Sequence, residues 1–298
     1  MAEARIPVVL RNPGQVFACL GLMEAAERIL DAHCEGAFEY EGGDTQARFA
    51  LWIPGDDDPV NTVVRFLAEA EVIAIAPRGS SLATEKWKVA SERRADDDPR
   101  FSVPEMGTPA AMPIVLRNEG VEVPIDHWAD GGGTGRDNVK FWAGSGGYPG
   151  AGLARDALTL VSALGANALA DACRDPFDVA APMSSSFRFD WRRDYIPLDV
   201  GFSLNDHSTM TPVGYPLVEI LAAIGMQHAR PSRISPRDKL AYRYGVSSAR
   251  LPTVFARAVL GCQGLGFPIR TFRMRLGWPG QENQARCIID AEEEFDHD

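Results

Sequence analysis

Apolar residues recur at helical spacing in two segments of the first 75 residues. The first segment is preceded by Asn12 and Pro13, which suit a helix cap and a first turn, and it carries Val16, Cys19, Leu20, Met23, Ala26 and Leu30. The second segment follows Asp58 and Pro59 and carries Val60, Val63, Val64 and Leu67. These spacings predict one helix over residues 16–30 and another that begins at residue 59.

Short apolar stretches surround these two helices. Residues 37–40 and 48–53 resemble strands, and the Gly42-Gly43-Asp44 turn between them indicates a hairpin. Residues 6–10 are predicted to form a first strand. The resulting order is β-α-β-β-α, which ferredoxin-like and RNA-recognition-motif folds share. We predict an α+β fold with mixed or antiparallel sheets and packed helices, although a fold alone assigns no function.

The later part of the chain is predicted to contain three helices and two strands. Helical spacing covers residues 153–169, a broadly apolar helix covers 215–226, and Ser235-Pro236 is typical of the start of a helix that ends at Gly245. Alternation of polar and apolar residues predicts strands at 187–192 and 269–276. The second of these strands places on one face Arg270, Phe272, Met274 and Leu276.

Composition divides the chain into four parts. Residues 1–76 form the α+β beginning, and residues 77–150 carry many glycine, proline and charged residues with weak periodicity, which predicts long glycine-rich loops. Residues 151–290 form a basic α+β part, and residues 291–298 form an acidic tail. The four parts are also compatible with one continuous domain.

The composition is typical of a soluble protein. The chain has 298 residues, of which 45% are hydrophobic and 24% charged, so intrinsic disorder is not expected. The apolar stretch at residues 217–226 is shorter than the roughly 20 residues that cross a bilayer, and no secretory signal is visible. We therefore expect a cytoplasmic protein without membrane association. Its five cysteines are widely spaced and form no C-x-x-C pair, which argues against a disulfide framework or a zinc ribbon.

Charge is distributed unevenly along the chain, whose formal net charge is −11. Residues 1–178 carry 16 basic and 28 acidic residues, residues 179–290 carry 14 and 8, and residues 291–298 carry none and 5. Residues 229–276 hold ten basic residues and one acidic residue, Asp238. A basic segment in an acidic chain favours local phosphate binding. It is also compatible with a solvated face, or with a patch that docks on the chain's own acidic half.

Basic residues interleaved with aromatic residues give the candidate nucleic-acid-binding set, because cations contact phosphates and aromatic rings stack on bases. Lys140 and Trp142 would share a strand face, and Lys239 and Arg243 would be neighbours on the predicted helix. A core position for Trp142 is an equally good interpretation. The full set is Lys140, Trp142, Arg188, Arg192, Arg193, Arg233, Arg237, Lys239, Arg243, Arg273 and Arg275.

A glycine-rich stretch covers residues 130–147. Glycines let backbone amides approach a phosphate closely, but neither the Walker A nor the Rossmann fingerprint fits this register, so a nucleotide-hydrolysis site is not expected. Loop contacts to nucleic acid are expected from Gly132, Gly133, Arg136 and Asn138.

An enzymatic alternative uses two Asp-His pairs. Asp126-His127 and Asp206-His207 could bind a divalent metal in a nuclease or phosphohydrolase. Neighbouring residues point in different directions, so each pair supplies at best one ligand to a site, and no hydrolase motif accompanies them. We predict no catalytic residue, no metal and no cofactor. A structural adaptor without nucleic-acid contact is a second alternative.

Three strings in the sequence point to a known family. They are residues 12–21 (NPGQVFACLG), 140–144 (KFWAG) and 215–225 (YPLVEILAAIG). Together they resemble the compact large-subunit-like protein of type I-U, also called I-G, CRISPR effector (Cascade) complexes. The resemblance is spread over residues 6–276. Larger relatives often end in a helical bundle, where this chain is expected to have a strand and an acidic tail.

The resemblance implies a non-enzymatic subunit of an RNA-guided surveillance complex in antiviral defence. Its partners would be guide RNA, target DNA, the backbone and other effector subunits, and a helicase-nuclease recruited in trans. In such complexes guide pairing reads the sequence, while protein subunits read a short flanking motif (the PAM) and hold the displaced strand. The glycine-rich stretch suits contact with that flanking motif.

Overall fold

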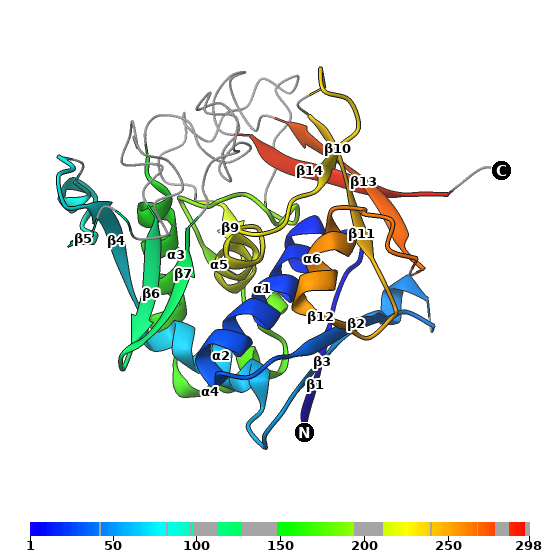
Figure 1. The fold of residues 1–298 in the computed structure, drawn as a ribbon, viewed down its shortest axis with the longest axis horizontal. Coiled ribbons are helices and arrows are strands. Elements are labelled where there is room, and N and C mark those ends of the chain that lie inside the picture. Colours follow the sequence, from blue (N-terminus) through cyan, green and yellow to red (C-terminus); the bar gives the residue numbers. More distant parts are fainter. Residues whose placement is uncertain are drawn as a thin grey trace.

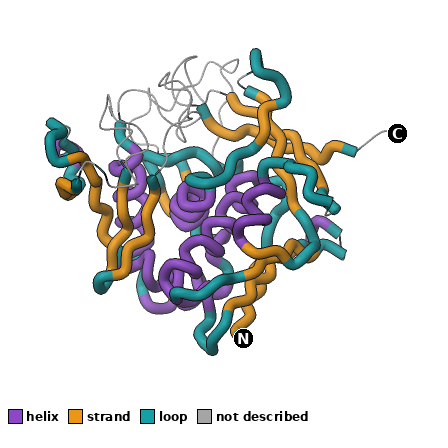
Figure 2. The backbone as a smooth tube through the Cα atoms, in the orientation of Figure 1, coloured by secondary structure: helices purple, strands orange, loops and turns teal. Residues whose placement is uncertain are grey.

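The computed structural model describes residues 1–41, 43–81, 83–95, 97, 113–126, 148–193, 211–238, 240–266, 268–277 and 286–295. Within them, six α-helices and three four-stranded sheets form an α+β fold, as predicted. The helices lie in the centre of the molecule and the sheets lie around them (Figures 1 and 2). None of the described helices combines the length and apolarity that a bilayer crossing requires.

The first sheet confirms the predicted β-α-β-β-α beginning. Its strand order is β1 (Ala2–Pro7), β3 (Arg48–Ile53), β2 (Glu35–Glu39) and β12 (Leu251–Pro252), all antiparallel. Helix α1 (Pro13–Leu30) joins β1 to β2, and α2 (Pro59–Glu69) follows β3. Asp58 caps α2, because its Oδ1 accepts hydrogen bonds from the amides of Val60 at 2.9 Å and Asn61 at 3.0 Å. The first strand ends at Pro7, earlier than predicted.

The second sheet lies largely within residues 77–150, where the sequence predicted loops. Its order is β5 (Ala90–Arg94), β4 (Glu71–Pro77), β6 (Ile114–Asn118) and β7 (Val121–Ile125), with β4 and β5 parallel and the other pairs antiparallel. The loop prediction is wrong for β5, β6 and β7. These five-residue strands are too short to stand out from the polar residues around them, yet Ile114, Val115 and Leu116 are completely buried.

The third sheet contains most of the basic segment. Its order is β10 (Ser232–Arg233), β11 (Ala241–Val246), β13 (Arg270–Gly277) and β14 (Cys287–Glu294), all antiparallel. The strand prediction at 269–276 is confirmed. The helix predicted from Ser235 to Gly245 is wrong, because Tyr242, Tyr244 and Val246 alternate as a strand does and bury one face. Ser235 instead begins a turn in which its carbonyl accepts from the Asp238 amide at 3.1 Å.

The remaining elements lie between the second and third sheets in sequence, except the last helix, which lies between β11 and β13. They are α3 (Gly150–Ser162), α4 (Ala166–Arg174), α5 (Pro216–Gly225) and α6 (Thr253–Leu260), with the short pair β8 (Ala181–Pro182) and β9 (Val213–Gly214). The helix at 215–226 is confirmed. The helix predicted over 153–169 is two helices, since Gly165 stands at the amino-terminal cap of α4.

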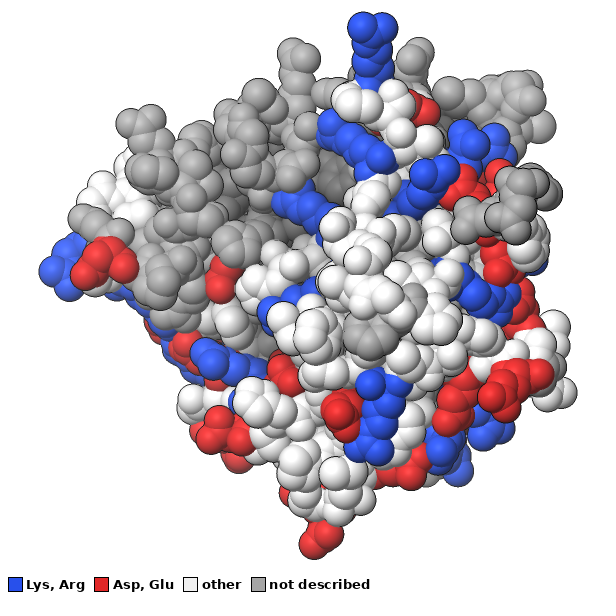
Figure 3. Space-filling model, turned by 45° about the vertical axis from the view of Figure 1, so that its right-hand side comes forward, with Lys and Arg blue, Asp and Glu red and all other residues white. Residues whose placement is uncertain are grey.

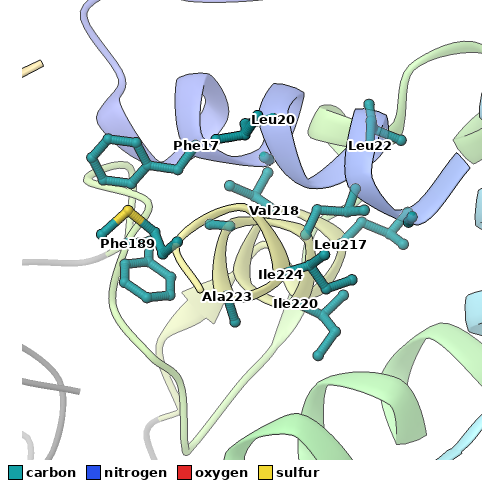
Figure 4. Packing of buried hydrophobic residues seen from close by; sticks show 14 of the residues in the cluster. Phe17, Leu20, Leu22, Phe189, Leu217, Val218, Ile220, Ala223 and Ile224 are labelled. Atoms are coloured by element: carbon teal, nitrogen blue, oxygen red, sulfur yellow. The ribbon is translucent and has the colours of Figure 1, made fainter. Parts of the chain in front are cut away.

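The helices α1 and α5 pack together at the centre of the core. Figure 4 shows Phe17 and Leu20 of α1 facing Val218 of α5, and all three side chains are buried. The approach is close because glycines stand where the helices cross: a Cβ on Gly21 would lie 2.6 Å from the Leu221 carbonyl carbon, and one on Gly225 would lie 2.7 Å from the Gly21 nitrogen. Larger residues cannot occupy these positions without separating the helices.

Candidate nucleic-acid interface

The third sheet presents one apolar face and one charged face. Phe272, Met274 and Leu276 of β13 point into the core, and the alternate residues Arg273 and Arg275 lie on the opposite face. The pairing register places Arg243 of β11 beside Arg273 on that face. The structure therefore brings together three of the predicted binding residues from two strands.

The acidic strand β14 neutralises much of this basic face. Arg275 donates to Asp290 at 3.0 and 2.5 Å, and Arg243 pairs with Glu294. On the core side, Arg270 donates to Glu293 at 2.7 and 2.6 Å. Hydrogen bonding to Asp290 raises the pKa of Arg275 above its ordinary value. The expectation of an acidic tail at 291–298 is wrong for residues 291–294, which complete β14.

Other predicted binding residues lie at the edge of this sheet, where acidic residues are scarce. Arg233 is half-buried on β10, and Arg237 is exposed in the turn that joins β10 to β11. Arg237 forms no ion pair with any residue that the structure describes. Figure 3 shows Lys and Arg side chains gathered at the top of the molecule, over this turn.

The segment of residues 187–193 is not the predicted strand. Phe187 and Phe189 are both completely buried and their rings stack at 5.5 Å. Arg188 between them adopts a left-handed backbone with φ of 67°, which a strand does not accommodate. The amides of Phe189 and Asp190 donate to the Glu219 carboxylate at 3.1 Å each. This carboxylate takes the hydrogen bonds that a neighbouring strand would have provided.

The three arginines of this segment are directed toward carboxylates or buried, not toward an open surface. Arg192 donates to Asp190 at 2.7 Å and lies 3.5 Å from the centre of the Tyr215 ring. Arg193 is close enough to Glu219 to act on its charge, and burial lowers the pKa of Arg188. Contacts within the fold therefore account for these three arginines, without a contact to nucleic acid.

Glu219 itself is a buried carboxylate in the first turn of α5. Burial raises its pKa to about 7, and the nearby charge of Asp190 acts in the same direction. The backbone amides of Phe189 and Asp190, together with Arg193, oppose this rise but do not cancel it.

Two of the three strings that carried the family resemblance form one structural unit. Residues 12–21 begin α1 and residues 215–225 make up α5, so these strings meet at the helix crossing. Asn12 does not cap α1 with its side chain. It donates instead to Asp190 at 2.9 Å, which ties α1 to the segment before α5. The third string, at 140–144, lies outside the described residues.

Several predicted site residues also lie outside the described residues. They are Lys140, Trp142, Lys239, Gly132, Gly133, Arg136 and Asn138, and, for the hydrolytic alternative, His127, Asp206 and His207. Asp126 is described, and its amide donates to the Gln227 side chain at 3.3 Å. Across the described part of the chain, no group of three metal-ligating side chains comes together.

Sequence reasoning missed the acidic partners on β14. Their signal was a matched spacing: Arg273 and Arg275 stand two residues apart on β13, and Asp290 and Glu292 stand two residues apart at the paired positions. Opposite charges at equal spacing are typical of cross-strand pairs.

Comparison with known proteins adds no relative: no family model matches the chain, and no curated protein or solved structure is found to be similar.

Proposed function

We propose that this chain is a non-catalytic, nucleic-acid-binding subunit of a type I CRISPR effector complex. It would act with guide RNA, target DNA and other effector subunits, and a separate helicase-nuclease would cut the DNA. Contact with the flanking motif would come from the glycine-rich stretch, at Gly132, Gly133, Arg136 and Asn138.

The observation that carries the proposal is the basic stretch of residues 230–237. It holds three arginines and no acidic residue: Arg230 and Arg233 are half-buried, and Arg237 is exposed and forms no ion pair with the described residues. A basic stretch with an exposed arginine, beside a sheet whose cations β14 neutralises, suits a phosphate backbone. The resemblance of the α1 and α5 strings supports the assignment at the level of the fold, since those strings build the core.

The partner prediction is tested by purifying the tagged chain from a host that expresses its neighbouring genes and a guide array. Uniform guide RNA and partner proteins that co-purify with the chain are the expected result. A chain that purifies alone, without RNA, would sink the proposal.

The surface is tested by charge reversal within the same complex. Arg237→Glu is expected to weaken binding of target DNA about tenfold and to reduce the salt dependence by about one phosphate contact. The matched control is Arg174→Glu on α4, an exposed arginine at the other end of the molecule (Figure 1). Equal effects of the two substitutions would contradict the assignment of this surface.

The internal neutralisation of Arg243 and Arg275 favours one alternative, a structural adaptor without nucleic-acid contact. An adaptor would co-purify with partner proteins and no crosslinked nucleic acid. Its association would be insensitive to Arg237→Glu unless the partner is acidic.

A further inference from the structure

A buried carboxylate outside the third sheet organises a second basic cluster. Glu24 of α1 has a side chain that is only 5% exposed, and it accepts three hydrogen bonds. Arg257 Nε of α6 donates at 2.9 Å, the Gln227 amide donates at 3.1 Å, and His228 Nδ1 lies 3.0 Å away. Glu24 thus joins three parts of the chain: α1, the segment after α5, and α6.

Arg257 is held at one end and available at the other. Its Nε is bound to Glu24, while its two terminal amino groups donate to none of the described residues. About a third of the side chain, 32%, remains exposed. An arginine fixed through Nε presents its terminal pair in a set direction, which suits two oxygens of one anionic group.

The exposed side of this cluster lines an open groove of about 620 Å³. The groove is bounded by Gln227, His228, Ala229, Arg230 and Arg257, so none of its described lining residues is acidic. Glu24, which holds Arg257, does not line this groove. A second groove of about 790 Å³ shares Gln227, His228 and Arg257, but Glu24, Glu27, Asp31 and Glu122 also line it, so it is acidic. A phosphate chain at Arg257 would therefore follow the first groove, toward Arg230, and not the second.

We propose that Glu24, His228 and Arg257 form a preorganised phosphate site on the path of a single-stranded nucleic acid. The inference rests on the nucleic-acid-binding part of the proposed function. Arg257 would hold two oxygens of one phosphate, and Arg230 would contact the next. The strand would then continue along the chain toward Arg233 and Arg237.

A nucleic acid fits this site better than an acidic protein segment does. The groove that Arg230 and Arg257 line is open, which suits a chain that passes through it, and Arg233 and Arg237 follow Arg230 at intervals of three and four residues in the sequence. A phosphate backbone carries one charge at each regular step, which matches a series of cations. An acidic protein remains an outcome that the experiment detects.

The test uses the purified full-length chain with fluorescent 30-nucleotide single-stranded RNA and DNA at low salt. Arg257→Gln is expected to weaken binding about tenfold and to reduce the salt dependence by about one contact. Arg257→Lys keeps a cation for Glu24 but lacks the fork, so it is expected to weaken binding about fivefold while the melting temperature stays within about 2 °C of the wild type. Arg174→Gln is the control and should leave binding unchanged.

Ultraviolet crosslinking of the unmodified chain, followed by peptide mapping, checks the site independently of any variant. Crosslinks in residues 227–230 or 253–260 are expected. Binding that is equal for wild type, Arg257→Lys and Arg174→Gln would overturn the inference, as would wild-type chain that binds neither oligonucleotide. A third result would overturn the inference in favour of an acidic protein partner. In that result poly-glutamate binds the chain at this site, while Arg257→Lys leaves the affinity for both oligonucleotides unchanged. Co-purification of guide RNA from the host is a separate result, so the proposed function can stand when this site fails.

Discussion

Replacement of Gly21 by alanine tests the central packing of the molecule. The added Cβ would lie 2.6 Å from the Leu221 carbonyl carbon, where an ordinary contact begins near 3.4 Å. The obstacle is the backbone of α5, which cannot rotate away as a side chain can. The carbonyl oxygen of Leu221 would lie closer still, so the two helices must separate by more than the 0.8 Å by which these two distances differ.

The cost follows from the residues on both sides of the crossing. A gap of this size forfeits a quarter to a half of the dispersion energy between facing atoms, and the buried Phe17, Leu20 and Val218 all lose contacts. We expect about 3 kcal/mol from this overpacking, offset by about 1 kcal/mol because alanine favours a helix more than glycine does. The net loss of about 2 kcal/mol lowers the melting temperature of a chain of this length by about 3 °C.

The measurement is thermal unfolding followed by circular dichroism, with Gly79→Ala as the control. Nothing lies within 4 Å of a Cβ at Gly79, so this variant should melt at the wild-type temperature or slightly above it. Gly225→Ala should destabilise the protein as Gly21→Ala does, and the double variant should lose less than the sum, because the first change already separates the helices. A Gly21→Ala protein as stable as the Gly79→Ala protein would refute the close crossing.

Three further predictions concern single carboxylates. The pKa of Glu219, raised by burial to about 7, means that its ionisation destabilises the fold as pH rises from about 4.5 to 7, by about 3 kcal/mol in total. The free energy of unfolding by urea should therefore change less between pH 5 and pH 8 for Glu219→Gln than for the wild type. Glu122 behaves in the opposite way: partial burial opposes its ionisation, but hydrogen bonds from Arg94 and Arg117 lower its pKa to about 2. Glu122→Gln should lose about 1 to 2 kcal/mol at pH 7, and the difference from wild type should shrink as pH falls from 4.5 toward 2; a deficit that is constant with pH would contradict this. Asp58→Ala removes the cap of α2 and should cost about 1 kcal/mol in the same assay, while Asp58→Asn should retain most of that stability.

The elements that the sequence predicted correctly are those whose periodicity is strong and local. Helix α1, helix α5 and strand β13 each repeat apolar residues over two turns or more, or alternate them over a whole strand. Ser235-Pro236 shows the limit of local signals. It has the residues that are typical of a helix start. The pairing of β11 with β13 buries Tyr242 and Tyr244 on one sheet face, and this tertiary burial outweighs the local helix preference.

The candidate site was predicted less completely because charge along a sequence does not reveal which charges meet. Arg243, Arg275 and Arg237 look alike in the sequence, yet only Arg237 lacks a carboxylate partner among the described residues. The buried Glu24 offered even less signal, since its partners Arg257 and His228 lie more than 200 residues away. Pairs between residues so far apart in the sequence can be identified only from the folded structure.

The acidic strand β14 sets an upper limit on how strongly this chain can hold nucleic acid by charge alone. If all ten basic residues of 229–276 met phosphates, single-strand affinity would fall about ten-thousand-fold between 50 and 200 mM salt. Carboxylates within the chain already serve as counterions for Arg243, Arg250, Arg270 and Arg275, which leaves at most six of the ten cations for phosphates. Six contacts correspond to a fall of about three-hundredfold over the same range. A chain with so few contacts binds nucleic acid weakly and dissociates from it rapidly. Tight binding at physiological salt would then depend on the other subunits of an assembly.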